Sequence, residues 1–115
     1  MTRPGTATIT AAAAPLALVN VYEVDPAQQA ALCALLSEQT EAVLRHVPGF
    51  VSASYHASLD GTKVVNYAQW RGQEEFAAFM ADPDNRAQLA RFAALARSVS
   101  PVLCRVTAVH AAPAG

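Results

Sequence analysis

The sequence predicts an α+β fold in which helices cover one face of an antiparallel sheet. Runs rich in β-branched and aromatic residues alternate with stretches whose apolar residues recur at helical spacing. An Asp60-Gly61 pair between two of the strand-like runs is typical of a hairpin, which makes those two strands antiparallel. The chain has 115 residues, of which 53% are hydrophobic and 15% charged, so it can form one domain with a substantial core.

The predicted elements follow one another in the order βαββαβ. Residues 16–24 form a β-branched and aromatic run that is typical of a strand. Asp25 and Pro26 then supply an N-cap and a first-turn proline for a helix that ends near His46, before a Pro-Gly pair. The later elements are strands at 50–58 and 62–70, a short helix at 73–81, a second helical piece at 84–99 that Ser100-Pro101 breaks, and a last strand at 102–110.

This order predicts a single ferredoxin-like domain over residues 15–111, with a flexible tail at 1–14 and a loose end at 112–115. The tail loosely imitates a signal peptide, but its apolar part is thin and the more apolar run at 16–24 is better used as a strand. No stretch approaches the roughly 18 apolar residues that a membrane span requires. We therefore expect a cytoplasmic protein without a membrane partner.

Charge and cysteine content limit the function further. The net charge is −1 and no run of Lys or Arg occurs, so the basic stripe of a nucleic-acid-binding surface is missing and no nucleic-acid partner is expected. Cys33 and Cys104 lie in apolar stretches without a CxxC spacing, which is typical of buried free thiols. A disulfide between them is the alternative, and it would require an oxidising compartment.

The register of the hairpin predicts which side chains share a face. Counting outward from a two-residue turn at 60–61 pairs Tyr55 with Asn66. The same count pairs Val51 with Trp70. One face then holds Val51, Ala53, Tyr55, Ala57, Val64, Asn66, Ala68 and Trp70. An amide, a phenol and an indole N–H thus converge on an otherwise apolar face with small alanines, which predicts a pocket under the helices; ordinary core packing is the alternative.

The histidines do not form a second candidate site. His56 is the residue type best suited to act as a general base near neutral pH, but the register places it on the opposite face of the hairpin from Asn66. We interpret His56 as structural for that reason. His46 and His110 lie on other elements without the spacing of metal ligands, so no metal site is predicted.

The hairpin also resembles a known family. The runs PGFVSASYHAS at 48–58, DGT at 60–62 and VVNYAQW at 64–70 are similar to antibiotic biosynthesis monooxygenases, and most of all to the small cofactor-independent anthrone oxygenases of aromatic polyketide biosynthesis. The resemblance implies a homodimeric α+β barrel, in which two sheets pack back to back and each subunit holds its substrate between sheet and helices. It also implies oxidation of an anthrone-type polyketide, or a similar polyphenol, to a quinone, with O₂ as co-substrate and no cofactor.

In this family the residues that match Asn66 and Trp70 are tied to catalysis, and the residue that matches Tyr55 lines the pocket. We therefore expect Asn66 to engage the substrate oxygen on which charge develops when the enolate forms. The indole N–H of Trp70 would donate to the same oxygen or to the peroxide that follows. Tyr55 would orient a phenolic group of the substrate.

Two positions depart from the family pattern. A tyrosine that members carry early in the helix after the tryptophan falls on Phe76 here. An arginine of the following helix falls on Ala90, and Arg86 and Arg91 lie close enough to replace it. Phe76, Arg86 and Arg91 are therefore expected to bind the substrate, whose orientation or identity would differ from the family pattern.

Two alternative functions remain open from the sequence. Haem-degrading relatives of the same fold need an asparagine on the first strand, for which Asn20 qualifies, and a histidine on the later helices to bind iron. No histidine occurs between His56 and His110, so haem degradation is disfavoured and Asn20 is assigned to substrate binding. The other alternative is a non-catalytic dimeric binding domain, or a cyclase-like helper, on the same scaffold.

Overall fold

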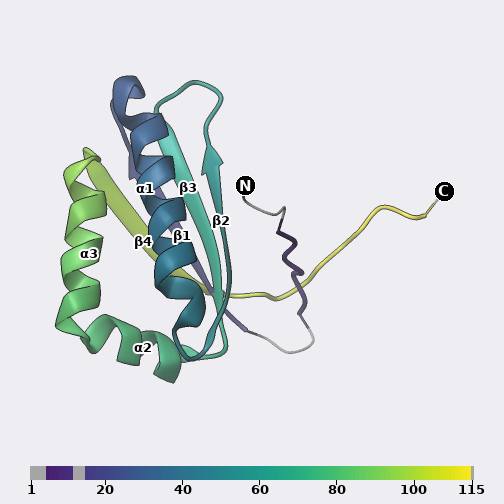
Figure 1. Ribbon diagram of the computed structural model, residues 1–115. Helices are drawn as coiled ribbons and strands as arrows, with labels where there is room; N and C mark the ends of the chain where they lie inside the picture. The colour runs from purple at the N-terminus through teal and green to yellow at the C-terminus, as the bar shows by residue number, and fades with distance from the viewer. Residues whose placement is uncertain (1–4, 12–14, 115) are drawn as a thin grey trace.

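Helices cover one face of a four-stranded antiparallel sheet in the computed structural model, which describes residues 5–11 and 15–114 (Figure 1). The elements in chain order are β1 (Leu16–Glu23), the 3₁₀ turn η1 (Pro26–Gln28), α1 (Gln29–Ala42), the 3₁₀ turn η2 (Leu44–His46), β2 (Phe50–Ala57), β3 (Lys63–Trp70), α2 (Gln73–Ala81), α3 (Pro83–Ala94) and β4 (Ser98–Arg105). The strand order is β2-β3-β1-β4. This arrangement confirms the predicted ferredoxin-like α+β fold.

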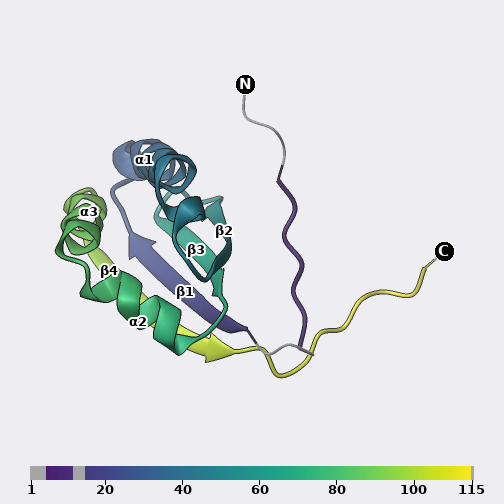
Figure 2. The same cartoon turned by 60° about the horizontal axis from the view of Figure 1, so that its bottom comes forward.

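The view in Figure 2 shows that α1, α2 and α3 lie on the same side of the sheet, while none of the described residues forms a helix on the other side. We call the first side the helix-facing side and the second the outer side. None of the described helices is long and apolar enough to cross a membrane. The predicted tail at 1–14 falls partly outside the described residues, and residues 106–114 form neither helix nor strand.

The boundaries predicted at the C-terminal end are wrong. The helix expected through Val99 ends at Ala94, and the last strand covers Ser98–Arg105 in place of residues 102–110. Pro101 does not break this strand but lies inside it, paired with Asn20 of β1. Because β4 is an edge strand, the missing N–H of a proline can be tolerated on its unpaired side.

The hairpin turn is also longer than predicted. Ala57 ends β2 and Lys63 begins β3, so the pair expected between Leu59 and Thr62 does not form. The Ser58 N–H donates to the Lys63 carbonyl at 3.0 Å, and this bond closes a four-residue loop. Both turn lengths leave the same residues paired beyond the loop, so the predicted pairing of Tyr55 with Asn66 is confirmed.

A β-bulge between Phe50 and Ser52 ends the predicted register early. Trp70 pairs with Phe50, and the predicted pairing with Val51 is wrong. The extra residue of a bulge is left unpaired and turns away from its expected face, and Val51 is accordingly 54% exposed. The bulge instead brings the Phe50 ring edge-on against the Trp70 indole, with the ring centroids 5.6 Å apart.

The apolar core consists of two clusters on the helix-facing side. The first cluster is formed by Tyr22, Val24, Leu32, Leu36, Val64 and Phe92, and the second by Leu16, Leu18, Ala68 and Trp70. In the register of β1 with β3, Tyr22 pairs with Val64 and Leu18 with Ala68, and the row between these two pairs is Asn20 with Asn66. A polar row thus divides the core into two halves.

Two glycines with positive φ provide a test of this packing. Gly49 (φ +86°) and Gly61 (φ +82°) adopt the same left-handed conformation, but a Cβ on Gly49 would overlap Glu75, whereas one on Gly61 would lie 3.5 Å from Pro26. We expect Gly61→Ala to cost about 1–2 kcal/mol from backbone strain alone. Gly49→Ala should cost about 1–3 kcal/mol more, because steric overlap is added to the strain. Urea denaturation measures both, and equal losses would contradict the close approach at Gly49.

Candidate active site

Three polar side chains occupy one row across three strands. Tyr55 of β2 pairs directly with Asn66 of β3, and Asn66 pairs directly with Asn20 of β1. Neighbouring strands lie about 4.8 Å apart, and directly paired residues point to the same face of a sheet. The phenol and the two amides therefore emerge side by side on the helix-facing side. We call these three residues the polar row.

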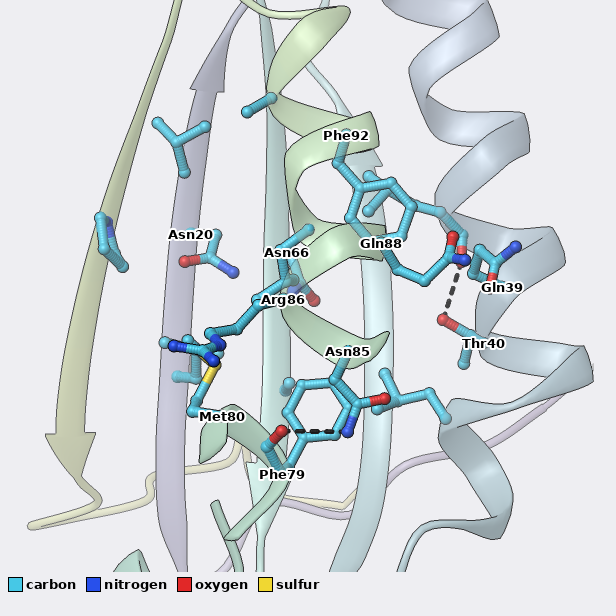
Figure 3. A pocket seen from close by; sticks show the side chains of 18 of the residues that line it. Asn20, Gln39, Thr40, Asn66, Phe79, Met80, Asn85, Arg86, Gln88 and Phe92 are labelled. Carbon is cyan, nitrogen blue, oxygen red and sulfur yellow. Dashed lines mark hydrogen bonds between the residues drawn. The ribbon is translucent and has the colours of Figure 1, made fainter. Parts of the chain in front are cut away.

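A cavity of about 470 Å³ lies over the polar row, where the pocket was predicted (Figure 3). This volume is in the range of small-molecule sites. Its floor is the sheet, with Leu18 and Ala68 beside the polar row, and its walls come from all three helices. The other wall residues are mostly apolar or carry neutral polar groups. Among the residues that line the cavity, only Arg86 carries a charge at neutral pH.

Asn66 carries an unsatisfied group in this cavity. Its side chain is 7% exposed, and its Oδ1 is buried without a hydrogen-bond partner among the described residues. A buried carbonyl that loses its hydrogen bonds to water costs about 1–3 kcal/mol, so such groups are rare unless a ligand or water supplies a donor. The orphaned Oδ1 marks Asn66 as the position where a hydrogen-bond donor is missing.

Tyr55, in contrast, is hydrogen-bonded. Its hydroxyl contacts the Thr40 hydroxyl of α1, which in turn donates to the Leu36 carbonyl at 2.8 Å. Burial raises the pKa of Tyr55 above its usual value. Burial also raises the pKa of Tyr22, in the next row of the sheet, to about 12. Both phenols are therefore protonated at neutral pH.

The Trp70 indole forms the end wall of the cavity and is held by aromatic contacts. It is 2% exposed, and its ring centroid lies 5.6 Å from that of Phe50, 5.5 Å from Phe76 and 5.2 Å from Phe79. Edge-on and tilted contacts of this kind favour a fixed ring orientation. Phe76 thus lines the cavity and supports the indole, but it offers no hydroxyl.

The two candidate arginines are placed differently. Arg86 lines the cavity, with an exposed side chain at its mouth, and takes part in none of the three ion pairs found between the described residues (Figure 3). Arg91 does not line the cavity, and its Nη1 donates to the Gln88 carboxamide at 2.8 Å on the exposed side of α3. The structure therefore brings Arg86, and not Arg91, to the candidate site.

His56 lies away from the cavity, as predicted from the register. It is exposed on the outer side of the sheet, where its Nε2 is 2.9 Å from the Ser54 hydroxyl. Within residues 5–11 and 15–114, no three side chains of His, Cys, Asp or Glu gather in a way that could hold a metal ion. Cys33 and Cys104 are both free and half-buried, whereas the sequence predicts fully buried thiols.

Comparison with known proteins agrees with this arrangement of sheet, helices and cavity. Residues 15–91 match the family model for antibiotic biosynthesis monooxygenases. The chain belongs to this family. The matched segment contains the whole polar row, Trp70, Phe76 and Arg86.

Two relatives in the antibiotic biosynthesis monooxygenase family are similar over most of their length. Tetracenomycin-F1 monooxygenase of Streptomyces glaucescens is 48% identical over 93 residues, which cover 78% of this chain and 80% of that protein. A monooxygenase from the gene ActVA-Orf6 of Streptomyces coelicolor, solved in complex with nanaomycin D, has a TM-score of 0.80 at 33% identity and covers 88% of this chain and 95% of its own. SnoaB, a cofactor-independent oxygenase of Streptomyces nogalater, shares the fold with a TM-score of 0.66 at 24% identity, over 87% and 98% of the two chains.

Thr40, a polar residue of the cavity that contacts Tyr55 of the polar row, was not predicted from the sequence. Thr40 was not singled out, because its contact with Tyr55 depends on how α1 crosses the sheet. The available signal was its spacing: Thr40 follows Leu36 by four residues, and Leu36 is part of the apolar stripe that faces the sheet. Asn85 was missed as well; it lines the cavity, and its amide donates to the Phe79 carbonyl at 3.0 Å, which joins α3 to α2.

The orphaned carbonyl leads to a prediction about stability. Asn66→Leu should raise the free energy of unfolding by about 1 kcal/mol or more, because it removes a buried acceptor that has no partner. Tyr55→Phe should instead lower it by about 0.5–1.5 kcal/mol, because this variant removes a hydrogen bond that is satisfied. Urea denaturation without ligand measures both changes. A loss of stability in Asn66→Leu that matches the loss in Tyr55→Phe would show that the Asn66 carbonyl has a partner.

Proposed function

We propose that this chain is a cofactor-independent monooxygenase that oxidises an anthrone-type aromatic polyketide, or a similar polyphenol, to a quinone with O₂. The observation that carries the proposal is the polar row, with its orphaned amide oxygen, at the floor of an apolar cavity of about 470 Å³. Apolar walls suit a flat aromatic substrate, and the polar row suits its oxygen substituents. The relatives support this class, since one acts on tetracenomycin F1 and another was solved with nanaomycin D.

The protein does not have to supply an oxidant, because O₂ accepts the electrons of the substrate. The methylene of an anthrone, flanked by aromatic rings and activated by the carbonyl, loses a proton to give an enolate. The enolate transfers one electron to O₂, and the radical pair combines at that carbon to form a hydroperoxide after protonation. Loss of water from the hydroperoxide leaves the second carbonyl of the quinone. One O₂ is consumed and one water is released, so atoms and electrons balance.

The side chains of the cavity have three tasks in this reaction. Asn66 donates a hydrogen bond from its Nδ2 to the substrate oxygen on which negative charge develops, since its Oδ1 can only accept. The Trp70 N–H donates to the same oxygen or to the peroxide. Tyr55 orients a phenolic group. The Tyr55 hydroxyl is held by its contact with Thr40 and the Trp70 ring by its aromatic contacts, so both groups are oriented before the substrate arrives.

Arg86 adds an electrostatic contribution at the mouth of the cavity. No carboxylate or imidazole lines the cavity among the described residues, so the substrate proton leaves to solvent in this mechanism. A positive charge that is not neutralised by an ion pair lowers the free energy of a nearby enolate, and the apolar walls reduce the dielectric screening between them. Arg86 therefore favours the deprotonated substrate without taking the proton.

Oxygen uptake with emodinanthrone in metal-free buffer tests the proposed activity. Wild-type protein should form quinone faster than buffer alone, and both Asn66→Ala and Trp70→Phe should lower kcat/KM by about 10²-fold, the effect of removing one group that stabilises charge in a transition state. Arg91→Ala is the control on the same helix as Arg86, since Arg91 points away from the cavity, and it should retain full activity.

Two results would contradict the proposal. Quinone formation no faster than in buffer would exclude the oxygenase function. If the protein nevertheless bound the anthrone, the non-catalytic binding domain would be the correct alternative. Unchanged turnover in both Asn66→Ala and Trp70→Phe would exclude the assigned site but leave the activity in place.

A homodimer is part of the proposal. No helix covers the outer side of the sheet (Figure 2). This side carries valines in adjoining rows: Val21 pairs with Val65, and Val19 pairs with Val102, which is 51% exposed. Partly exposed valines in the middle of a sheet face are stabilised when a second sheet packs against them. A second copy of the chain, packed back to back, is the occupant that the family resemblance implies.

Sedimentation equilibrium tests the dimer. The expected mass is twice the 12.1 kDa of one chain. Val21→Asp should shift the equilibrium toward the monomer, because it would bury an unpaired charge at the centre of the outer side. Leu59→Asp at the exposed tip of the hairpin is the matched control and should leave the mass unchanged. A monomeric wild-type protein would contradict this arrangement.

A further inference from the structure

The hydrogen bonds around Thr40 determine the direction of the Tyr55 hydroxyl. The Thr40 hydroxyl has one hydrogen, and its oxygen is 2.8 Å from the Leu36 carbonyl, which can only accept. If that hydrogen pointed at Tyr55 instead, two acceptor oxygens would face each other between Thr40 and Leu36. Both contacts are satisfied in only one way: Thr40 donates to Leu36, and Tyr55 donates to Thr40.

The cavity therefore meets the oxygen of Tyr55 and not its hydrogen. Tyr55 lines the cavity, and once its hydrogen is directed at α1, the lone pair that remains on the oxygen can only accept. The raised pKa of Tyr55 keeps the hydrogen on the phenol at neutral pH. The arrangement thus persists over the whole physiological range.

A second acceptor lies in the neighbouring position of the polar row. The Asn66 Oδ1 is buried without a partner, and Asn66 pairs directly with Tyr55 across β2 and β3. A ligand that presents a hydroxyl group to Tyr55 would supply the donor that the Tyr55 oxygen lacks. An ether or a carbonyl at the same place would put an oxygen lone pair against the Tyr55 oxygen and leave that oxygen unpaired.

We propose that Thr40 is a positioning residue that holds Tyr55 as a hydrogen-bond acceptor, so that the cavity selects polyphenols with a free hydroxyl beside Tyr55 over the corresponding methyl ethers. This inference rests on the proposed function for the class of substrate and extends it to the substitution pattern. Discrimination of this kind is strong, since a site built to bond a hydroxyl rejects an analogue that leaves its buried polar groups unpaired.

The consequence for synthesis order follows from the same chemistry. A site that requires a free hydroxyl must act before any O-methylation at that position. A methyl transfer to this hydroxyl would therefore use the product of the oxidation as its substrate.

Anaerobic ligand titration measures the selectivity without turnover. Trp70 is the only tryptophan of the chain and lines the cavity, so quenching of its fluorescence reports binding. The two probes are a dihydroxyanthrone and the matched dimethoxyanthrone. Wild-type protein should bind the dihydroxy compound at least about tenfold more tightly, which corresponds to the loss of one buried hydrogen bond. Equal binding of the two compounds, or binding of neither, would contradict the proposal.

Variants at Thr40 separate positioning from shape. Thr40→Val keeps the shape of the side chain but removes its oxygen. The Tyr55 hydrogen can then turn into the cavity and donate to an ether. The preference for the dihydroxyanthrone over the dimethoxyanthrone should therefore fall to within about twofold. Thr40→Ser keeps the hydroxyl and should keep the wild-type preference. Thermal unfolding of each variant confirms that it is folded. A Thr40→Val protein with the full preference would overturn the proposal.

The double variant completes the test. In a Tyr55→Phe background, Thr40→Val should have no further effect on the preference, because Thr40 acts only through Tyr55. An effect of the same size in both backgrounds would overturn the positioning role. Failure of the Thr40 proposal can be distinguished from failure of the proposed function. Selective anaerobic binding without quinone formation in air would contradict only the oxygenase activity. Quinone formation without selective binding would contradict only the role of Thr40.

Discussion

The structure of this protein depends on a polar row that crosses the middle of an apolar sheet face. Asn20 and Asn66 lie between a row formed by Tyr22 and Val64 and a row formed by Leu18 and Ala68. Burial of amides at this place opposes folding, and the Asn66 carbonyl has no hydrogen-bond partner among the residues that the structure describes. The two apolar clusters on either side supply the burial that keeps the sheet and helices together, so the unfavourable row can be maintained where a ligand would need it.

Each helix has a distinct relation to this row. Thr40 of α1 takes up the hydrogen of the Tyr55 hydroxyl, so that only its oxygen remains for a ligand. Phe76 and Phe79 of α2 pack against Trp70 and hold the indole at the end of the cavity. Helix α3 closes the cavity with apolar residues and carries one charge at its mouth. The helices therefore contribute orientation and desolvation, while the strands contribute the polar groups themselves.

Sequence reasoning succeeded where the structure depends on local periodicity. Alternation along two neighbouring strands was sufficient to pair Tyr55 with Asn66, and the error in turn length did no harm because both turns preserve the same pairing. It failed where the cause is not local. The bulge that removes Val51 from the face, the pairing of Asn20 with Asn66, and the contact of Thr40 with Tyr55 all join segments whose relative placement the sequence does not state.

The spacing of residues along α3 is sufficient to decide which of the two candidate arginines, Arg86 or Arg91, faces the cavity. The family resemblance predicts an arginine at the position of Ala90, and both Arg86 and Arg91 lie near it in the chain. Helical geometry distinguishes them: residues four apart lie on the same face, whereas neighbouring residues point about 100° apart. Arg86 precedes Ala90 by four residues and both line the cavity, while Arg91 does not. Arg86 therefore brings a positive charge to the cavity from a position one turn closer to the start of α3 than Ala90.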